Sequence, residues 1–209
     1  MRKLISAIVF MMAANSTIVL AKTETAVFAG GCFWCVEKDM DRIKGVVATT
    51  SGFASDHKTQ ASYNNHPGSV EAVKVEFDPA IVSYDNLVAR FVRGVDVTDA
   101  DGQFCDRGDG YTSAIFTLTL AQTASAEKTL RDAEAQLGQK VVTPVKKLAQ
   151  FVAAEDSHQN YYLGQNRIFT RFGFIKQADA YERYRKACGR DARVKKLWGA
   201  AAYSSGSGS

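Results

Sequence analysis

A strand-like run meets a helix at Thr25-Ala26-Val27-Phe28-Ala29-Gly30-Gly31-Cys32-Phe33-Trp34-Cys35, which also places two cysteines three positions apart. Residues 25–29 predict a strand, and Val36, Met40 and Ile43 follow at helical spacing. A thiol at such a junction lies beside unpaired backbone N–H groups and the positive end of the helix dipole. This position is expected to lower a cysteine pKa and to make the sulfur nucleophilic at neutral pH. The pattern indicates redox or nucleophilic thiol chemistry.

The segments on either side of this junction predict a β-α-β-β-α-β order. Strands are expected over 25–29, 46–50, 70–77 and 113–120, and helices over 32–44, from Ser83 to 92 and over 125–137, where Gly138 ends the last one. The polar stretches 53–68 and 96–110 predict loops. This order is typical of the α+β class, and specifically of a two-layer ferredoxin-like sandwich. A coil and helical C-terminal extension follows, with helices expected over 179–186 and 191–198.

The N-terminus predicts a secretory signal peptide over residues 1–21. Arg2 and Lys3 precede an apolar stretch, and small residues lead to a cleavage site after Ala21. A polar break at 15–17 leaves no uninterrupted apolar run of the roughly 20 residues that a membrane-spanning helix needs. We therefore expect an exported, periplasmic protein with one domain over 22–203. A disordered Ser/Gly tail is expected over 204–209.

Charge and cysteine content limit the possible functions. The net charge of +4 falls to about +2 when Arg2 and Lys3 are removed, and no basic run argues for nucleic-acid binding. The four cysteines are Cys32, Cys35, Cys105 and Cys188. An even count in an exported chain is compatible with two structural disulfides. A chain with 46% hydrophobic residues has its own core, however, so a catalytic use of the cysteines is at least as plausible.

Four sequence blocks, spanning Gly30 to about Leu163, resemble the peptide methionine sulfoxide reductase A family. They are Gly31-Cys32-Phe33-Trp34, then Glu71-Ala72-Val73 with Asp78-Pro79, then Asp106-Arg107-Gly108-Asp109-Gly110-Tyr111-Thr112-Ser113-Ala114-Ile115-Phe116, and finally Ala154-Glu155-Asp156-Ser157-His158-Gln159-Asn160-Tyr161. The blocks occur in family order. The chain departs from the family pattern at Gly52-Phe53-Ala54-Ser55-Asp56 and at Ser69, where a histidine is common.

The resemblance implies an enzyme that reduces methionine S-sulfoxide, in proteins or free. Cys32 would attack the sulfoxide sulfur, become a sulfenic acid and release methionine. Glu71 would be the acid that protonates the sulfoxide oxygen, and an apolar pocket can keep such a carboxyl protonated near neutral pH. If Val70 and Ala72 face the core, strand alternation turns Glu71 to the other side unless a bulge intervenes.

The resemblance also supplies a substrate pocket. Tyr63 and Tyr111 match tyrosines that hold the sulfoxide oxygen, and Asp106 matches an aspartate of the same pocket. Phe33 and Trp34 match an aromatic wall around the substrate methyl group, and sulfur and methyl groups pack well on aromatic rings. Without the resemblance, these tyrosines and aromatics would be interpreted as packing residues.

A second thiol must then resolve the sulfenic acid. Cys35 is the first candidate because it lies one helical turn from Cys32; Cys188, in a glycine-containing C-terminal stretch, is the second, and Cys105 the third. Cys105 and Cys188 could equally be inert buried thiols. The family resemblance implies no cofactor and no metal, and an external dithiol reductant such as thioredoxin or an exported equivalent. We expect a monomer that acts on oxidised proteins or free methionine sulfoxide, with no stable membrane insertion after cleavage.

The residues admit three other interpretations. The Glu155-x-x-His158 pair could ligate a metal, but only His57 and His66 remain to complete a site. An exported Cys-x-x-Cys at a helix start also suits a thioredoxin-like disulfide oxidoreductase, for which Thr143-Pro144 is the one plausible active-site proline loop. A non-catalytic binding module with two structural disulfides is the third.

Overall fold

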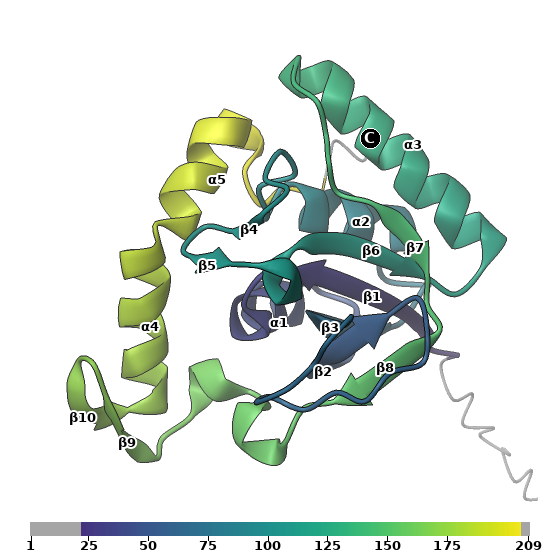
Figure 1. Ribbon diagram of the computed structural model, residues 1–209. Helices are drawn as coiled ribbons and strands as arrows, with labels where there is room; N and C mark the ends of the chain where they lie inside the picture. The colour runs from purple at the N-terminus through teal and green to yellow at the C-terminus, as the bar shows by residue number, and fades with distance from the viewer. Residues whose placement is uncertain (1–21, 206–209) are drawn as a thin grey trace, which may run out of the picture.

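The computed structural model describes residues 22–205 and has a mixed α+β fold, so the predicted α+β class is confirmed (Figure 1). The predicted signal peptide, residues 1–21, and residues 206–209 of the predicted tail lie outside the described residues. Within residues 22–205, no helix combines the length and the apolar character that crossing a membrane requires.

Six strands form one sheet in the order β7-β6-β1-β3-β2-β8. Their bounds are β1 (Glu24–Gly30), β2 (Val46–Ser55), β3 (Val70–Phe77), β6 (Ser113–Thr117), β7 (Val145–Lys147) and β8 (Gln150–Ala153). The β6–β7 pair is parallel and the other pairs are antiparallel. The prediction that residues 53–55 belong to a loop is wrong, because these residues pair with β8, and residues 53 and 54 also with β3.

The sheet is strongly curled, and the link between β7 and β8 requires it. These strands pair with opposite edges of the sheet, yet only Leu148 and Ala149 separate them. In a flat sheet the two strands would lie about 24 Å apart, whereas the chain from Lys147 to Gln150 spans at most about 11 Å. The Leu148 N–H donates to Thr117 O of β6 and the Ala149 N–H to Ser55 O of β2, both at 3.0 Å. The link thus joins the two edges of the sheet across one of its faces.

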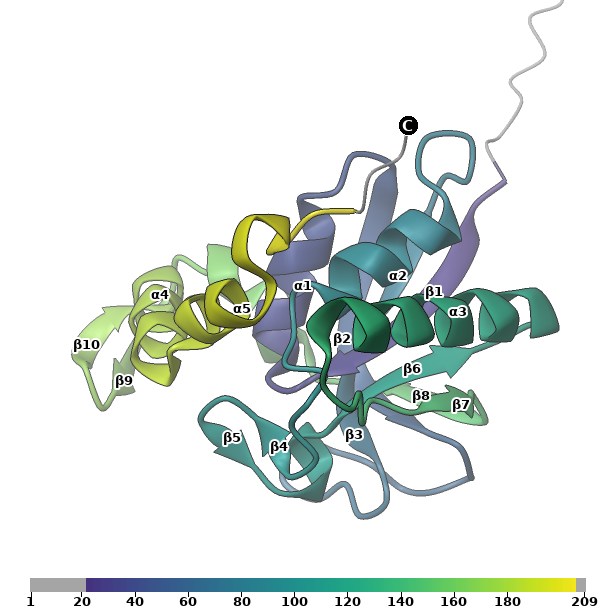
Figure 2. The same ribbon diagram turned by 90° about the horizontal axis from the view of Figure 1, so that it is seen from above.

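Three helices cover the other face of the sheet: α1 (Phe33–Asp41), α2 (Tyr84–Val92) and α3 (Leu120–Leu137) (Figure 2). Phe28 of β1 stacks on Phe91 of α2 with ring centroids 4.8 Å apart, at the centre of this core. As predicted, Ser83 caps α2 by accepting a hydrogen bond from the Asn86 N–H at 3.2 Å. α3 begins five residues before the predicted start, because Thr119 supplies a cap that the apolar pattern did not reveal.

Strand β3 divides its side chains between the two faces. Val73, Val75 and Phe77 belong to the helix-covered core, whereas Ala72 and Val70 belong to the smaller cluster on the opposite face. Glu71 alternates with Ala72 and therefore points to the helix-covered face, and its register with Phe53 of β2 is regular. No bulge is needed to bring Glu71 there, because Val70 and Ala72 do not face the helices.

The C-terminal extension packs beside α1. It contains a hairpin of β9 (Arg167–Thr170) and β10 (Gly173–Lys176), followed by α4 (Gln177–Cys188) and α5 (Arg190–Trp198). Both figures place α4 and α5 on the α1 side of the sheet, away from most of α3. A second two-stranded ribbon, of β4 (Gly102–Gln103) and β5 (Asp106–Arg107), lies in the predicted loop 96–110.

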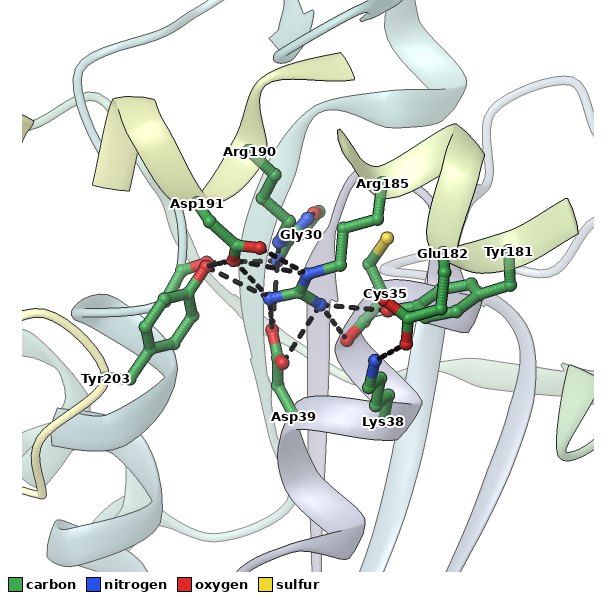
Figure 3. A network of polar contacts seen from close by, with 11 residues as sticks. Gly30, Cys35, Lys38, Asp39, Tyr181, Glu182, Arg185, Arg190, Asp191 and Tyr203 are labelled. Carbon is green, nitrogen blue, oxygen red and sulfur yellow. Dashed lines mark hydrogen bonds and ion pairs between the residues drawn. The ribbon is translucent and has the colours of Figure 1, made fainter. Parts of the chain in front are cut away.

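Buried arginines fasten this extension to α1 (Figure 3). The Arg185 guanidinium is 3.0 Å from Asp39 of α1 and 2.7 Å from Asp191 of α5. Tyr203 donates a hydrogen bond to the same Asp191 carboxylate at 2.5 Å. Arg190 donates to Gly30 O at 2.9 Å and to Gly94 O at 3.0 Å. Arg185 and Asp39 are almost excluded from water, so the charge of each has to be balanced by the ion pairs that it makes.

We expect Arg185→Ala to lower the free energy of unfolding by about 3–5 kcal/mol, because it removes the closer of the two ion-pair partners of the buried Asp39 and leaves only Arg190, at 3.7 Å. Urea denaturation followed by circular dichroism measures the change. Arg183→Ala, at an exposed position of the same helix, is the matched control and should cost less than about 0.5 kcal/mol. Equal losses in the two variants would contradict the anchoring role.

Candidate active site

The turn between β1 and α1 places Cys32 at the helix N-terminus. Gly31 adopts a φ of +75°, and a Cβ at this position would lie 2.5 Å from Cβ of the buried Gln103. Only glycine fits there without displacing its neighbour. Cys32 is the N-cap residue, and its carbonyl accepts a hydrogen bond from the Cys35 N–H at 3.0 Å. The Cys32 side chain is buried beneath a small pocket that it lines.

Glu71 reaches the same pocket from β3. Its carboxyl accepts a hydrogen bond from the Phe33 N–H, one of the unpaired groups at the start of α1, at 2.9 Å. The pKa of Glu71 is raised to about 8, chiefly by burial. The negative charge of Asp106 contributes to this rise, and the hydrogen bond from the Phe33 N–H opposes it. Glu71 therefore carries a proton at neutral pH, next to Cys32.

The pocket, of about 110 Å³, gathers residues from five separate segments of the chain. Its walls are Cys32, Phe33, Trp34, Tyr63, Glu71, Asp106, Tyr111 and Tyr184. Burial, with the nearby Glu71, raises the pKa of both Tyr63 and Tyr111 to about 12, so both hydroxyls remain hydrogen-bond donors at neutral pH. The structure thus brings together all of the catalytic and substrate-binding candidates taken from the sequence.

Aromatic rings form one side of the pocket. Trp34 stacks on Tyr161 with ring centroids 3.8 Å apart, and His158 stacks on Tyr63 at 4.0 Å. Phe33 is fully buried and supports Tyr63 from below, with centroids 6.3 Å apart. His158 therefore borders the pocket through its ring. Among residues 22–205, the one group of three potential metal ligands is Cys105, Asp106 and Cys188, which does not include His158.

The Cys32–Cys35 pair lies between opposite charges. Burial raises the pKa of Cys32 well above its usual value, and its contact with Cys35 and the carboxylates of Glu71 and Asp106 raise it further. The hydrogen bond from Cys32 lowers the pKa of Cys35 to about 7 against the effect of burial, and Arg190 and Arg185 lower it too. The expectation of a low pKa for the thiol at position 32 is therefore wrong: the thiolate-stabilising position is that of Cys35.

The other two cysteines form a disulfide. Cys105 and Cys188, 83 positions apart, are bridged with their Cα atoms 4.9 Å apart, and Cys105 is exposed. Their interpretation as inert buried thiols is wrong. Two structural disulfides are not formed either, since Cys32 and Cys35 are free. The bridge ties the end of α4 to the residue before Asp106.

Tyr184 is a pocket residue that the sequence interpretation missed. Tyr184 of α4 donates a hydrogen bond to the Asp106 carboxylate and meets the edge of Trp34. This hydrogen bond opposes the rise in the pKa of Asp106 that burial causes. No motif surrounds Tyr184, and it lies 78 positions from Asp106, so only the folded chain reveals the contact. Tyr161, the last residue of the fourth sequence block, lies next to the pocket through its stacking on Trp34.

Comparisons with known proteins agree with this arrangement. The family model described as peptide methionine sulfoxide reductase matches residues 24–199. "Peptide methionine sulfoxide reductase MsrA 2" of Rhizobium meliloti is 44% identical over 185 residues, which cover 88% of this chain and 87% of that protein. Methionine sulfoxide reductase A of Corynebacterium diphtheriae has a similar structure, with a TM-score of 0.64 and 28% identity over 74% of this chain and 84% of that one.

A more distant structure shares the fold. Mxr1 from Saccharomyces cerevisiae, solved in complex with Trx2, matches with a TM-score of 0.50 and 19% identity over 72% of this chain and 92% of that one. The family model covers well over half of the chain, and the Rhizobium relative is similar over most of its length. The chain belongs to the peptide methionine sulfoxide reductase family.

Proposed function

We propose that this chain reduces methionine S-sulfoxide to methionine with Cys32 as the nucleophile and Glu71 as the acid. The observation that carries the proposal is the junction of β1, α1 and β3, which places the Cys32 thiol and a protonated carboxyl in one pocket. The hydroxyls of Tyr63 and Tyr111 line that pocket and would donate to the sulfoxide oxygen, while Trp34 supplies an apolar wall for the methyl group.

The first step transfers one oxygen atom. Cys32 sulfur attacks the sulfoxide sulfur while Glu71 protonates the sulfoxide oxygen, and the thiol proton replaces the one that Glu71 gives. Net, R₂SO and the Cys32 thiol become R₂S and a Cys32 sulfenic acid, with methionine released. Protonation matters because an unprotonated sulfoxide oxygen is a poor leaving group.

The second step condenses the sulfenic acid with a thiol and releases water. Cys35 is favoured because it is a free neighbour of Cys32 on the same helical turn, and Arg185 and Arg190 stabilise its thiolate. Cys188 is the second candidate; it is bridged to Cys105 at the rim of the pocket. A reduced Cys105/Cys188 pair could exchange with a Cys32–Cys35 disulfide, which would leave the pairing found in the structure.

An external dithiol would complete the cycle. The exposed position of Cys105 makes the Cys105–Cys188 disulfide accessible to a reductant. The yeast structure in complex with Trx2 supports a thioredoxin or an exported equivalent as that reductant. Membership in a sulfoxide reductase family leaves the thioredoxin-like oxidoreductase interpretation without support.

We further infer a ferredoxin-like arrangement for the central strands, an exported location and a monomeric state. The strand order β6-β1-β3-β2, with α1 and α2 on one face, supports the first. The predicted signal peptide supports export. Since one chain supplies every wall of the pocket, a monomer is sufficient for activity.

Glu71→Gln should slow the first step by roughly ten- to ten-thousand-fold, because the amide cannot give a proton to the oxygen. Single-turnover rates across pH 6–10 measure the effect. The ratio of the wild-type rate to the variant rate should be constant below about pH 8 and fall about tenfold per unit above it, as Glu71 loses its proton.

The matched control for this test is Glu37→Gln. Glu37 is a second buried glutamate, on α1, whose pKa burial raises to about 7, but it does not line the pocket. Its single-turnover rate should stay within a few-fold of the wild type. A pH-independent ratio for Glu71→Gln would remove Glu71 from the proton transfer.

Cys32→Ser should abolish turnover, whereas Cys35→Ser should complete one turnover per enzyme and then stop, because the sulfenic acid lacks its partner. Release of methionine with and without a dithiol-protein reductant distinguishes the two, and mass spectrometry identifies the bridged cysteines. The Cys105→Ser/Cys188→Ser double variant serves as the comparison. Sustained turnover by Cys35→Ser with that reductant would assign the resolving role to Cys188.

Export predicts a mature protein that begins at Lys22 and is found outside the cytoplasm. N-terminal sequencing after osmotic-shock fractionation measures both. A chain that retains Arg2 and Lys3 and stays with cytoplasmic markers would overturn the proposed location.

A further inference from the structure

A second cavity lies beside the catalytic pocket and shares two of its walls. Trp34 and Tyr184 line both cavities. The second cavity has a volume of about 140 Å³, slightly larger than that of the pocket over Cys32. Its remaining walls come from Tyr161 and from the C-terminal extension, which supplies Phe172 in the β9–β10 turn and Ala180 on α4. The proposed chemistry does not use this space.

The lining of this cavity suits an apolar group. Trp34 and Tyr161 present stacked rings, and the adjacent Ala180 and Tyr181 are buried in the base of the extension. Aromatic walls with few polar atoms favour an aliphatic or aromatic side chain, whose transfer from water stabilises the complex. Free methionine sulfoxide bound over Cys32 would leave this space empty.

Because the second cavity lies next to the pocket over Cys32, a side chain next to the methionine sulfoxide in the same polypeptide could occupy it. Neighbouring residues of a polypeptide have Cα atoms about 3.8 Å apart, and their side chains can enter two cavities that share a wall. The exposed Arg171 forms the rim of the second cavity. Its Cζ lies 4.8 Å from the ring centroid of Phe172 and 5.9 Å from that of Tyr184. In residues 22–205 it makes no ion pair, so its guanidinium can donate to carbonyl groups of a bound chain.

The β9–β10 hairpin extends the apolar surface beyond this cavity. Phe169 and Phe174 are 88% and 50% exposed, and their rings lie 4.6 Å apart. An exposed aromatic pair next to a substrate pocket is typical of a surface that contacts a partner. A polypeptide with apolar residues around its methionine would cover it.

We propose that the cavity between Trp34, Phe172 and Ala180 is a subsite for an apolar side chain next to the oxidised methionine in a polypeptide. The inference rests on the proposed function and narrows its substrate class to sulfoxides in hydrophobic segments, which unfolded chains expose. The C-terminal extension thereby sets sequence preference, while β1, α1 and β3 carry the chemistry.

Blocked pentapeptides test the subsite. One series carries Leu immediately before or after methionine S-sulfoxide, and the matched series carries Ser at the same position. For one of the two positions, kcat/KM should be roughly tenfold or more higher with Leu, as the burial of one aliphatic side chain predicts. Equal values at both positions would overturn the proposal. Reduction of N-acetylmethionine sulfoxide, which cannot reach the subsite with a side chain, reports separately on the proposed function.

Two variants change the cavity without touching the catalytic residues. Ala180→Phe fills it and Phe172→Ser removes a wall, so each should reduce the Leu-to-Ser ratio to about two or less while N-acetylmethionine sulfoxide is reduced at the wild-type rate. Leu120→Ser, at a residue 89% exposed on α3, is the control and should keep the wild-type ratio. If Ala180→Phe does not fold, Phe172→Ser decides. An unchanged ratio in the folded cavity variants would overturn the proposal.

Discussion

The hydrogen bond from the Phe33 N–H to the Glu71 carboxyl is the interaction on which the active site depends. It joins the first turn of α1 to β3, and so fixes the thiol of Cys32 beside the acid. One contact satisfies an otherwise unpaired helix group and holds a carboxyl in a place where burial keeps it protonated. Gly31 makes the contact possible, because only a residue without a side chain passes Gln103.

Burial, the hydrogen bond between the two thiols and the nearby charges shift the pKa values of Cys32 and Cys35 in opposite directions. Acids surround Cys32 and cations surround Cys35, across a single helical turn. The cations belong to the C-terminal extension, whose arginines are themselves held by Asp39 and Asp191. The arginines of the extension therefore help to lower the pKa of Cys35. Through Tyr184 and the Cys105–Cys188 bridge, the extension also contacts Asp106 of the pocket and the residue before it.

Local patterns were sufficient for β1 and β3, for the first half of β2, for α1 and α2 and for the pocket residues that lie in sequence blocks. The Gly-Cys-Phe-Trp block carries its information within a few residues, so Cys32 could be predicted from it, whereas Glu71 could be predicted only through the family resemblance. Contacts made across the chain could not: Arg185 meets Asp39 at a separation of 146 positions, and no local period marks either residue as an ion-pair partner. β7 and β8 are too short to show alternation, and pairing with β6 and β2 defines them. The pKa order of the two thiols depends on burial and on the hydrogen bond between them, and then on charges from distant parts of the chain, so only the folded structure reveals it.

The short link of Leu148 and Ala149 has a consequence for an enzyme whose proposed substrates are unfolded chains. Extended polypeptides readily add as a further strand to an exposed edge strand, whose backbone N–H and C=O groups are unpaired. In this protein the two edges of the sheet curl toward one another, and the edge strands β7 and β8 have only three and four residues. A bound polypeptide therefore finds few free backbone groups with which to pair. An oxidised polypeptide would then bind through its side chains near Cys32 and dissociate again, instead of pairing with the sheet and starting an aggregate.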